Sequence, residues 1–300
     1  MADMERSAMN GDSSGKKPGD SRTEGVSLFR PGQPIRREPV TLDQATGREI
    51  FAAPNLLRQS NPDRVWDSLT AVALDATALA GNGLFVNSQP EQPAASAFDI
   101  LRTRLLQAMA QRGWKRIAVT SPTHGCGKSF VAANLALSLA RMPGTRTVLV
   151  DLELRKPGMA ALLGIKGTGP IRDLLTGDQP LESHLQRVGR NLALALNGTA
   201  VADAAELLHE PDTAAALEAM LEQLDPAVAI YDLPPALGSD DVITMLPQVD
   251  AVLLVADGTR TTAEDVRACE RLFEGRVPLM GVVLNRSQDR SEDRYRYGRK

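Results

Sequence analysis

The sequence has few of the residues that build disulfide frameworks and metal centres. Among its 300 residues there are two cysteines and three histidines. The cysteines, Cys126 and Cys269, lie far apart and form no metal-ligand spacing, and the three histidines are scattered and form no cluster. These absences exclude a small disulfide-stapled fold and fit the reducing conditions of a cytoplasm.

Aromatic residues are also scarce, and positive charge is not in excess. Aromatic residues make up 4% of the chain against 43% for all hydrophobic types, so the core must consist mainly of alanine, valine and leucine. A net charge of −3 gives no sign of a protein that binds nucleic acid through bulk charge. The chain has neither an apolar run of about 20 residues nor the apolar region of an N-terminal signal peptide. We therefore expect a cytoplasmic protein with no nucleic-acid partner.

Composition divides the chain into four parts. Residues 1–47, rich in glycine, serine, proline and charge, predict a disordered N-terminal tail. Residues 48–94 predict a partly ordered segment and a linker. The apolar residues of this segment fit either packing on the main domain or a helix for a membrane surface or a partner. Residues 95–286 hold the periodic strands and helices of a nucleotide-binding domain, and residues 287–300 predict a flexible tail with two tyrosines.

One stretch organises the main domain. It consists of an apolar strand, a turn with Gly125 and Gly127, the pair Lys128 and Ser129, and a helical run rich in alanine and leucine. In this order the backbone N–H groups and the positive end of the helix face an anion, the lysine reaches the terminal phosphates, and the serine hydroxyl can hold Mg²⁺. Pro122 stands where the usual pattern begins with glycine. The stretch still predicts a nucleotide-binding loop.

Apolar strands alternate with helices along the rest of the domain. This alternation predicts an α/β P-loop NTPase fold, a mostly parallel sheet with helices on both faces. Asp151 and Asp232 end two of the strands, and Glu153 follows closely. Because ligands of such sheets lie beyond the carboxyl ends of the strands, we expect these carboxylates to hold Mg²⁺ beside the phosphate loop. The strands expected after the loop are 147–151, 192–196, 227–232, 251–256 and 279–284.

Several short motifs together resemble one family. Residues 120–129 (TSPTHGCGKS) with 133–136 (ANLA) are similar to the phosphate loop of the bacterial tyrosine kinases (BY-kinases) of capsule and exopolysaccharide synthesis. Residues 148–157 (VLVDLELRKP) resemble their second acidic motif, and residues 230–235 (IYDLPP) with 239–240 (SD) resemble their Walker B segment. Further matches are residues 171–177 (IRDLLTG), 205–208 (AELL) and 281–285 (GVVLN).

The resemblance implies a cytoplasmic kinase that uses ATP and Mg²⁺ and phosphorylates tyrosines of its own C-terminal tail in trans. It also implies a membrane partner that regulates polysaccharide chain length and recruits the kinase to the inner face of the membrane. Lys128 and Asp151 would be catalytic, with Asp151 activating the tyrosine hydroxyl. The nucleotide would contact Thr123, His124, Gly125, Cys126, Gly127, Lys128, Ser129, Phe130 and Asn285; the metal would contact Ser129, Asp151, Glu153 and Asp232; the acceptors would be Tyr295 and Tyr297.

The sequence departs from the family pattern at several positions. Glu153 takes the second acidic position, Cys126 stands where the loop commonly has glutamate, and His124 where it commonly has proline. In the oligomerisation helix of the family, residues 96–102 (SAFDILR) keep only the last of three motif residues. We therefore expect a monomer or dimer rather than a ring. Cys126 fits either a redox switch above the phosphates or a small residue tolerated in the loop.

Two alternative functions stay open at this point. One is a partitioning-type ATPase, although such proteins carry a second lysine early in the loop, where this chain has Thr123. The other is a non-catalytic nucleotide-binding regulator of a polysaccharide assembly, whose motifs would persist without turnover. The polar tail fits an acceptor segment, and it also fits a solvated charged tail in which tyrosine occurs by chance.

Overall fold

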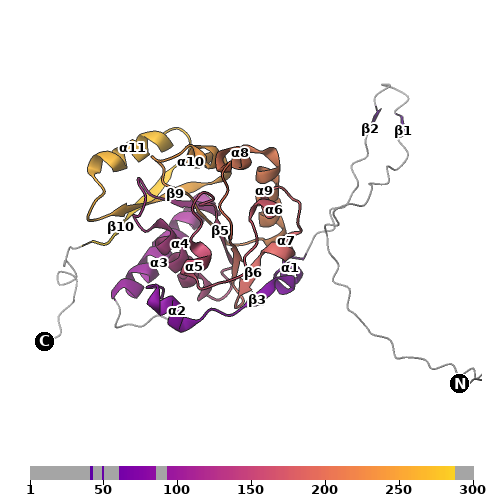
Figure 1. Cartoon of the computed structure of the whole chain (residues 1–300), viewed down its shortest axis with the longest axis horizontal. Coiled ribbons are helices and arrows are strands. Elements are labelled where there is room, and N and C mark those ends of the chain that lie inside the picture. Colours follow the sequence, from indigo (N-terminus) through magenta and orange to yellow (C-terminus); the bar gives the residue numbers. More distant parts are fainter. Residues whose placement is uncertain (1–40, 43–48, 51–60, 86–92, 288–300) are drawn as a thin grey trace, which may run out of the picture.

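The computed structural model describes residues 41–42, 49–50, 61–85 and 93–287. Its centre is an eight-stranded sheet in the order β10-β9-β4-β8-β5-β7-β6-β3 (Figure 1). All neighbouring pairs in this sheet are parallel except β6 and β7. The strands are β3 Thr70–Val72, β4 Arg116–Thr120, β5 Thr147–Asp151, β6 Gln186–Val188, β7 Leu192–Ala195, β8 Val228–Asp232, β9 Ala251–Asp257 and β10 Leu279–Asn285. The predicted α/β fold with a mostly parallel sheet is confirmed.

Helices cover both faces of the sheet. One face lies under α1 Pro62–Ser68, α6 Arg172–Leu175, α7 Leu181–His184, α8 Ala204–His209, α9 Pro211–Leu224, α10 Asp241–Met245 and α11 Ala263–Phe273. The other lies under α2 Ala76–Gly81, α3 Pro93–Arg112, α4 Lys128–Ala140 and α5 Met159–Leu162. The short 3-10 helix Leu246–Gln248 follows α10, and β1 Thr41–Leu42 pairs only with β2 Glu49–Ile50.

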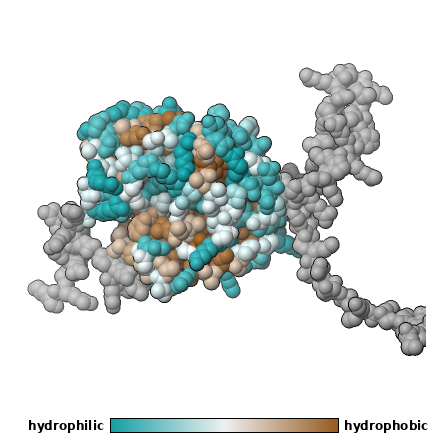
Figure 2. Space-filling view, viewed as in Figure 1, coloured by the Kyte–Doolittle hydropathy of each residue, from teal (hydrophilic) through white to brown (hydrophobic). Residues whose placement is uncertain are grey.

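The strands are apolar throughout because each of their faces is buried. In β4, Ile117 and Val119 point to the α4 side, whereas Ala118 points to the α9 and α11 side, and all three are 0% exposed. This alternation divides the core into two apolar layers separated by the sheet. Outside these layers, Figure 2 shows apolar residues on the visible face only in separate patches between hydrophilic ones.

The N-terminal segment of the described chain is part of this domain. Trp66 of α1 is 1% exposed, and its indole Nε1 donates a hydrogen bond of 2.7 Å to the carbonyl of Leu224. The guanidinium of Arg146 lies 5.1 Å from the centre of the indole ring. β3 adds the edge strand next to β6, and Leu79 of α2 is 0% exposed. Of the two interpretations of this segment, residues 61–85 therefore fit packing on the main domain rather than a helix for a membrane surface or a partner.

Two features of the structure were not among the sequence-based expectations. The first is the strand β6, antiparallel to β7, which gave no signal because two of its three residues are polar and all three are half-buried. In α3, the side chain of Asp99 turns toward α4 and accepts hydrogen bonds from Ser138 Oγ at 2.9 Å and from Arg141. The linker expected before residue 95 and the tail beyond residue 287 lie largely outside the described residues.

Candidate functional site

The glycine loop joins β4 to α4 at the carboxyl edge of the sheet. Gly125 and Gly127 have φ values of 78° and 90°, which side chains rarely adopt. A Cβ atom on Gly127 would lie only 2.2 Å from Nδ2 of Asn285, so any other residue here would displace the Asn285 side chain as well as strain the backbone. Gly127 caps α4 without a side-chain hydrogen bond. The first N–H groups of this long helix therefore have no side-chain acceptor and remain open on the loop side. An anion site requires such open N–H groups.

Lys128 is enclosed by acidic groups at the start of α4. Its Nζ lies 2.8 Å from Glu153 Oε2 and 3.5 Å from Asp232 Oδ1, and it donates to Ser129 Oγ at 3.2 Å. The side chain is buried. Burial lowers the lysine pKa, but the charges of Asp232 and Glu153 outweigh burial and hold the pKa of Lys128 above its usual value. The lysine is thus a fixed cation at the phosphate loop.

Asp151 and Asp232 lie side by side because β5 and β8 pair in register there. Both are 0% exposed, and Oδ2 of each has no hydrogen-bond partner among the described residues. Burial, with a further contribution from Asp232, raises the pKa of Asp151 to about 8. Burial also raises the pKa of Asp232. Two buried carboxylates with an open oxygen each are stabilised by a cation, and Mg²⁺ prefers oxygen ligands of this kind.

The acidic groups do not all have the same surroundings. Oδ1 of Asp151 accepts a hydrogen bond of 3.2 Å from the backbone N–H of Glu153, whereas the Glu153 carboxylate faces Lys128. Ser129 donates a hydrogen bond that lowers the pKa of Asp232. No preformed cluster of three metal ligands occurs among the residues that the structure describes. Ser129, Asp151 and Asp232 fit Mg²⁺, which usually takes one or two carboxylates and completes its shell with water and substrate phosphates.

The remaining loop residues expected at the nucleotide have different environments. Thr123 and His124 are exposed, whereas Cys126 is 1% exposed, with its Sγ 3.2 Å from the carbonyl of Thr123. Although burial raises the thiol pKa, hydrogen bonds with Thr123 and Thr261 hold the pKa of Cys126 below its usual value. Phe130 turns its ring away from the loop and packs edge-on against Phe98, with ring centres 6.0 Å apart.

Asn285, expected near the adenine, lies at the end of β10 directly against the loop. Its Nδ2 donates a hydrogen bond of 2.9 Å to the carbonyl of Cys126. The expected acceptors Tyr295 and Tyr297 lie outside the described residues. Tyr231 is 0% exposed and packs in the core, as expected for a tyrosine inside a strand.

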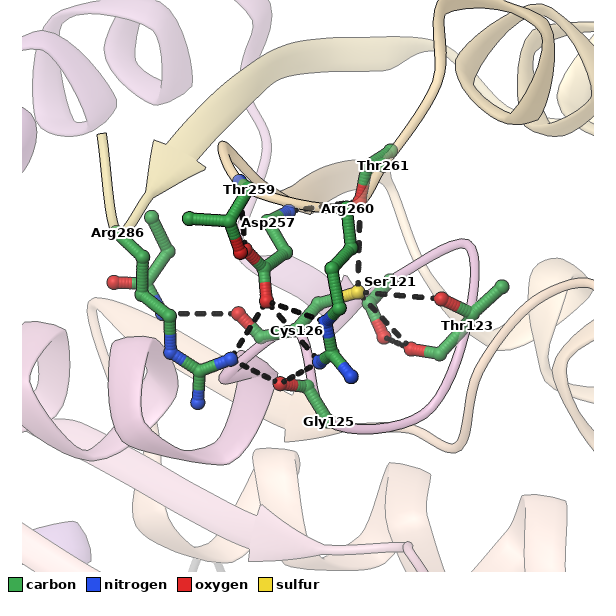
Figure 3. Close-up of polar contacts among 10 residues, drawn as sticks. Ser121, Thr123, Gly125, Cys126, Asp257, Thr259, Arg260, Thr261 and Arg286 are labelled. Carbon is green, nitrogen blue, oxygen red and sulfur yellow. Dashed lines mark hydrogen bonds and ion pairs between the residues drawn. The ribbon is translucent and has the colours of Figure 1, made fainter. Parts of the chain in front are cut away.

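A group of residues opposite Lys128 was missed from the sequence (Figure 3). The carbonyl of Gly125 accepts hydrogen bonds from Arg260 Nη2 at 3.0 Å and from Arg286 Nη1 at 2.8 Å. Both guanidinium groups also bind the carboxylate of Asp257 at the end of β9. Asp257 ends an apolar strand as Asp151 and Asp232 do, and this shared position is a signal that could have identified it.

The fold and the site define a P-loop NTPase, because a Lys-Ser loop meets strand-terminal carboxylates at the carboxyl edge of a parallel sheet. Residues 114–295 match the family described as "ParA: NUBPL iron-transfer P-loop NTPase". Among solved structures, the VpsO kinase domain is 30% identical, with a TM-score of 0.57 over 67% of this chain and 99% of that domain. The kinase domain of Escherichia coli tyrosine kinase ETK is 27% identical, with a TM-score of 0.62 over 71% of this chain and 83% of that one.

The names of curated relatives point to the same family. The tyrosine-kinase homologue EpsB of Ralstonia nicotianae is 30% identical over 87% of this chain, and tyrosine-protein kinase YwqD of Bacillus subtilis is 26% identical over 70% of it. The chain spans 33% of the length of EpsB and 88% of the length of YwqD. The chain belongs to the P-loop NTPases and, within them, to the BY-kinase family of capsule and exopolysaccharide synthesis. No helix in its described part is long and apolar enough to span a bilayer.

Proposed function

We propose that this chain is a protein-tyrosine autokinase that uses ATP and Mg²⁺ and regulates exopolysaccharide or capsule synthesis and export. The observation that carries the proposal is the pair of buried carboxylates, Asp151 and Asp232, next to the ion-paired Lys128. Phosphoryl transfer needs bound phosphates, a metal and a group that accepts the proton of the attacking hydroxyl. The names of YwqD and ETK support tyrosine as the acceptor.

Each residue of the site has a distinct role in this proposal. Lys128 binds the terminal phosphates through a charge-assisted hydrogen bond, and the N–H groups of residues 125–129 line the phosphate chain. Ser129, Asp151 and Asp232 would hold the metal, joined by Glu153 once phosphate takes its place at Lys128, and the metal would neutralise charge on the phosphates. Asp151 accepts the proton of the tyrosine hydroxyl at its open Oδ2. The other loop residues from Thr123 to Phe130 would contact the nucleotide, Phe130 through its backbone because its ring packs against Phe98, and so would Asn285.

The proposed acceptors are Tyr295 and Tyr297 in the polar segment after β10. Arg294, Arg296 and Arg299 flank them and favour approach to an acidic, phosphate-bearing site. After transfer, the same arginines are suited to pair with the new phosphates. The segment serves another subunit in trans in this proposal. The third tyrosine, Tyr231, is excluded as an acceptor by its burial.

The proposal extends to the setting of the kinase. A membrane protein that regulates polysaccharide chain length recruits the chain to the inner face of the membrane, and the chain acts as a monomer or dimer. The division of the chain into a tail, a packed segment, a kinase domain over residues 95–286 and an acceptor tail is part of the same proposal.

A non-catalytic nucleotide-binding regulator is the second candidate. The observation in its favour is the 2.8 Å ion pair between Lys128 and Glu153, which occupies the lysine that phosphate would need. This pair breaks on nucleotide binding in a kinase and persists in a regulator that binds without turnover. The two candidates therefore differ in turnover and not in fold.

Incubation of the full chain with labelled ATP and Mg²⁺, followed by phosphotyrosine detection and mass spectrometry, tests the proposal. We expect phosphate on Tyr295, Tyr297 or both, and none after chelation of the metal. Transfer that persists unchanged in the Tyr295→Phe, Tyr297→Phe double variant would reject the tail as the main acceptor. ATP binding without any phosphotyrosine, with or without added membrane partner, would favour the regulator.

A further inference from the structure

A buried carboxylate organises the side of the phosphate loop that lies away from Lys128. Asp257 is 0% exposed, and Oδ1 accepts hydrogen bonds from the N–H and the hydroxyl of Thr259, at 2.9 and 2.6 Å. Oδ2 accepts from Arg286 Nη1 at 2.6 Å and from Arg260 Nε at 3.2 Å. The donors of Thr259, Arg286 and Arg260 outweigh burial and hold the pKa of Asp257 well below its usual range. Asp257 is therefore a charged residue fixed by its neighbours.

Both arginines held by Asp257 also hold the phosphate loop. Each donates to the same backbone oxygen, that of Gly125, from opposite directions (Figure 3). Their own positions are set by the ends of neighbouring strands, because Arg260 follows β9 and Arg286 follows β10. The backbone supports this arrangement: Gly258 N donates to the carbonyl of Asn285 at 2.7 Å and so joins the two strand ends, and Asp257 N donates to Thr261 Oγ1 within the turn after β9. The carbonyl is thus tied to the sheet through three charged side chains.

The Gly125 carbonyl needs such a restraint for a physical reason. Gly125 has a φ of 78°, and a glycine at this point can rotate its peptide groups at little steric cost. If the peptide between Gly125 and Cys126 turned over, its carbonyl oxygen would face the phosphates and its N–H would face away. An anion site built from N–H groups would then lose one donor and gain a negative dipole. Two charge-assisted hydrogen bonds to the carbonyl oppose this rotation.

We propose that Asp257, Arg260 and Arg286 are positioning residues for nucleotide binding, which fix the Gly125 carbonyl outward so that the loop presents its N–H groups to phosphate. The inference rests on the proposed function only in taking a nucleoside di- or triphosphate as the ligand. It assigns the arginines to the loop backbone and not to the phosphates. Arg260 and Arg286 share both the Gly125 carbonyl and Asp257 as acceptors, so either arginine alone retains part of the restraint.

Calorimetric titration of the full chain with Mg-ADP and Mg-ATP tests this inference. We expect Asp257→Asn to raise the Kd for both nucleotides about tenfold or more, since hydrogen bonds between charged partners are among the strong ones. The single variants Arg260→Gln and Arg286→Gln should each raise Kd about threefold or less, and the double variant should raise it by more than the product of the two. In an Arg260→Gln background, Arg286→Lys should raise the Kd less than Arg286→Gln does.

Direct contact between the arginines and phosphate predicts a different pattern. Asp257→Asn would then leave both cations in place and remove a competing anion, so the Kd would stay equal or fall. An unchanged or lower Kd in this variant, or strictly multiplicative effects of the two arginines, would overturn the inference. If Asp257→Asn does not fold, the arginine variants decide alone, because the side chains of Arg260 and Arg286 are 60% and 52% exposed and their replacement leaves the core intact.

Two controls distinguish a specific effect on nucleotide binding from the loss of any exposed arginine and from a loss of stability. Arg271→Gln removes an arginine of similar exposure that pairs with Glu264 on α11, and its Kd should equal that of the wild type. Thermal unfolding without nucleotide should show equal Tm values for Arg271→Gln and the arginine variants of the loop. Loss of binding in Lys128→Met together with unchanged binding in Asp257→Asn would overturn this inference and leave the proposed function intact. Unchanged binding in Lys128→Met would overturn the proposed function.

Discussion

The two sides of the phosphate loop contain buried aspartates in opposite states. On the Lys128 side, Asp151 has an oxygen without a partner, and burial raises its pKa to about 8. On the other side, Asp257 is equally inaccessible, yet its two oxygens accept four hydrogen bonds and its pKa is depressed. Burial therefore does not decide the charge of a strand-terminal aspartate, whereas its donors do. An unsatisfied carboxylate is left for a ligand, and a satisfied one holds the protein itself in place.

Lys128→Met should give the largest effect on the Lys128 side. It removes the cation that contacts Glu153 and Asp232, and with it the contact to the terminal phosphate. We expect tyrosine phosphorylation to fall below detection, and ATP affinity to drop by about tenfold or more, as for the loss of a hydrogen bond between charged groups. Phosphotyrosine detection and calorimetry measure the two effects. The control is Lys166→Met at an exposed lysine, and equal loss in both variants would contradict the role of Lys128.

Asp151→Asn should lower the rate of transfer by about 10² to 10⁴, the range typical for a general base. Nucleotide affinity should change much less, because the amide keeps the shape of the carboxyl group. Single-turnover kinetics, with binding measured separately, distinguishes the two effects. Asp67→Asn at an exposed position of α1 is the matched control. Equal rates for wild type and Asp151→Asn would remove Asp151 from the mechanism.

Asp151→Asn should also remove a loss of stability that the wild type undergoes as pH rises. Because the pKa of Asp151 is raised from 3.8 to about 8 in the metal-free protein, the folded state keeps a proton that the unfolded state has lost between these pH values. The free energy of unfolding therefore decreases as pH rises through this window. Asp151→Asn removes this loss, so without metal it should be more stable than the wild type at pH 8 and differ less at pH 4. Denaturant unfolding at both pH values measures the difference. A wild type that gains stability from pH 4 to 8 relative to the variant would contradict the assignment.

Trp66→Ala tests a residue of the core that lies on neither side of the phosphate loop. The indole is 1% exposed and donates to the carbonyl of Leu224, so its removal should cost about 3 to 5 kcal/mol of unfolding free energy. The nucleotide Kd of the folded fraction should stay the same, because Trp66 belongs to the apolar layer next to α9 rather than to the loop. Chemical denaturation measures the loss, and Trp114→Ala, at a partly buried tryptophan, should cost less.

Asp99→Ala should give the smallest effect. Asp99 accepts hydrogen bonds from Ser138, Arg102 and Arg141 within its own chain, so it stabilises the contact between α3 and α4 by about 1 kcal/mol, as partly exposed ion pairs do. Light scattering should show a monomer or dimer for both the wild type and the variant. A stable octamer of the wild type would mean that other contacts replace the altered motif of residues 96–102.

The sequence predicted one side of the site well and the other side poorly. Lys128, Asp151 and Asp232 occupy positions fixed by regular elements, namely the start of a helix and the ends of two strands, and parallel strands bring such ends together. The contact of Arg260 and Arg286 with Gly125 joins residues 135 and 161 positions apart through irregular turns. One of these residues, Arg286, has a φ of 56°, which no local pattern in the sequence indicates.

The same contrast holds for the fold. The long apolar strands, and the helices α3 and α11 between them, were predictable from the sequence, α3 from the spacing of its apolar residues three and four apart. The edge strand β3 and its neighbour β6, each three residues long, were not, because so short a segment has no measurable period and its pairing depends on the rest of the sheet. The ring of Phe130 shows a further limit, since membership of a loop motif does not say which way a side chain turns.

The end of β10 fixes where the proposed acceptor segment begins. Asn285 and Arg286 are bonded to the carbonyls of Cys126 and Gly125, so the chain leaves the domain beside its own phosphate loop. Tyr295 follows eight positions beyond Ser287, and eight residues span at most about 26 to 29 Å when fully extended. A group on so short a tether has an effective concentration in the millimolar range around its own site. Dilution does not lower this local concentration, so in the proposed function a second subunit that offers its tail in trans would compete with the tethered tyrosine of the same chain.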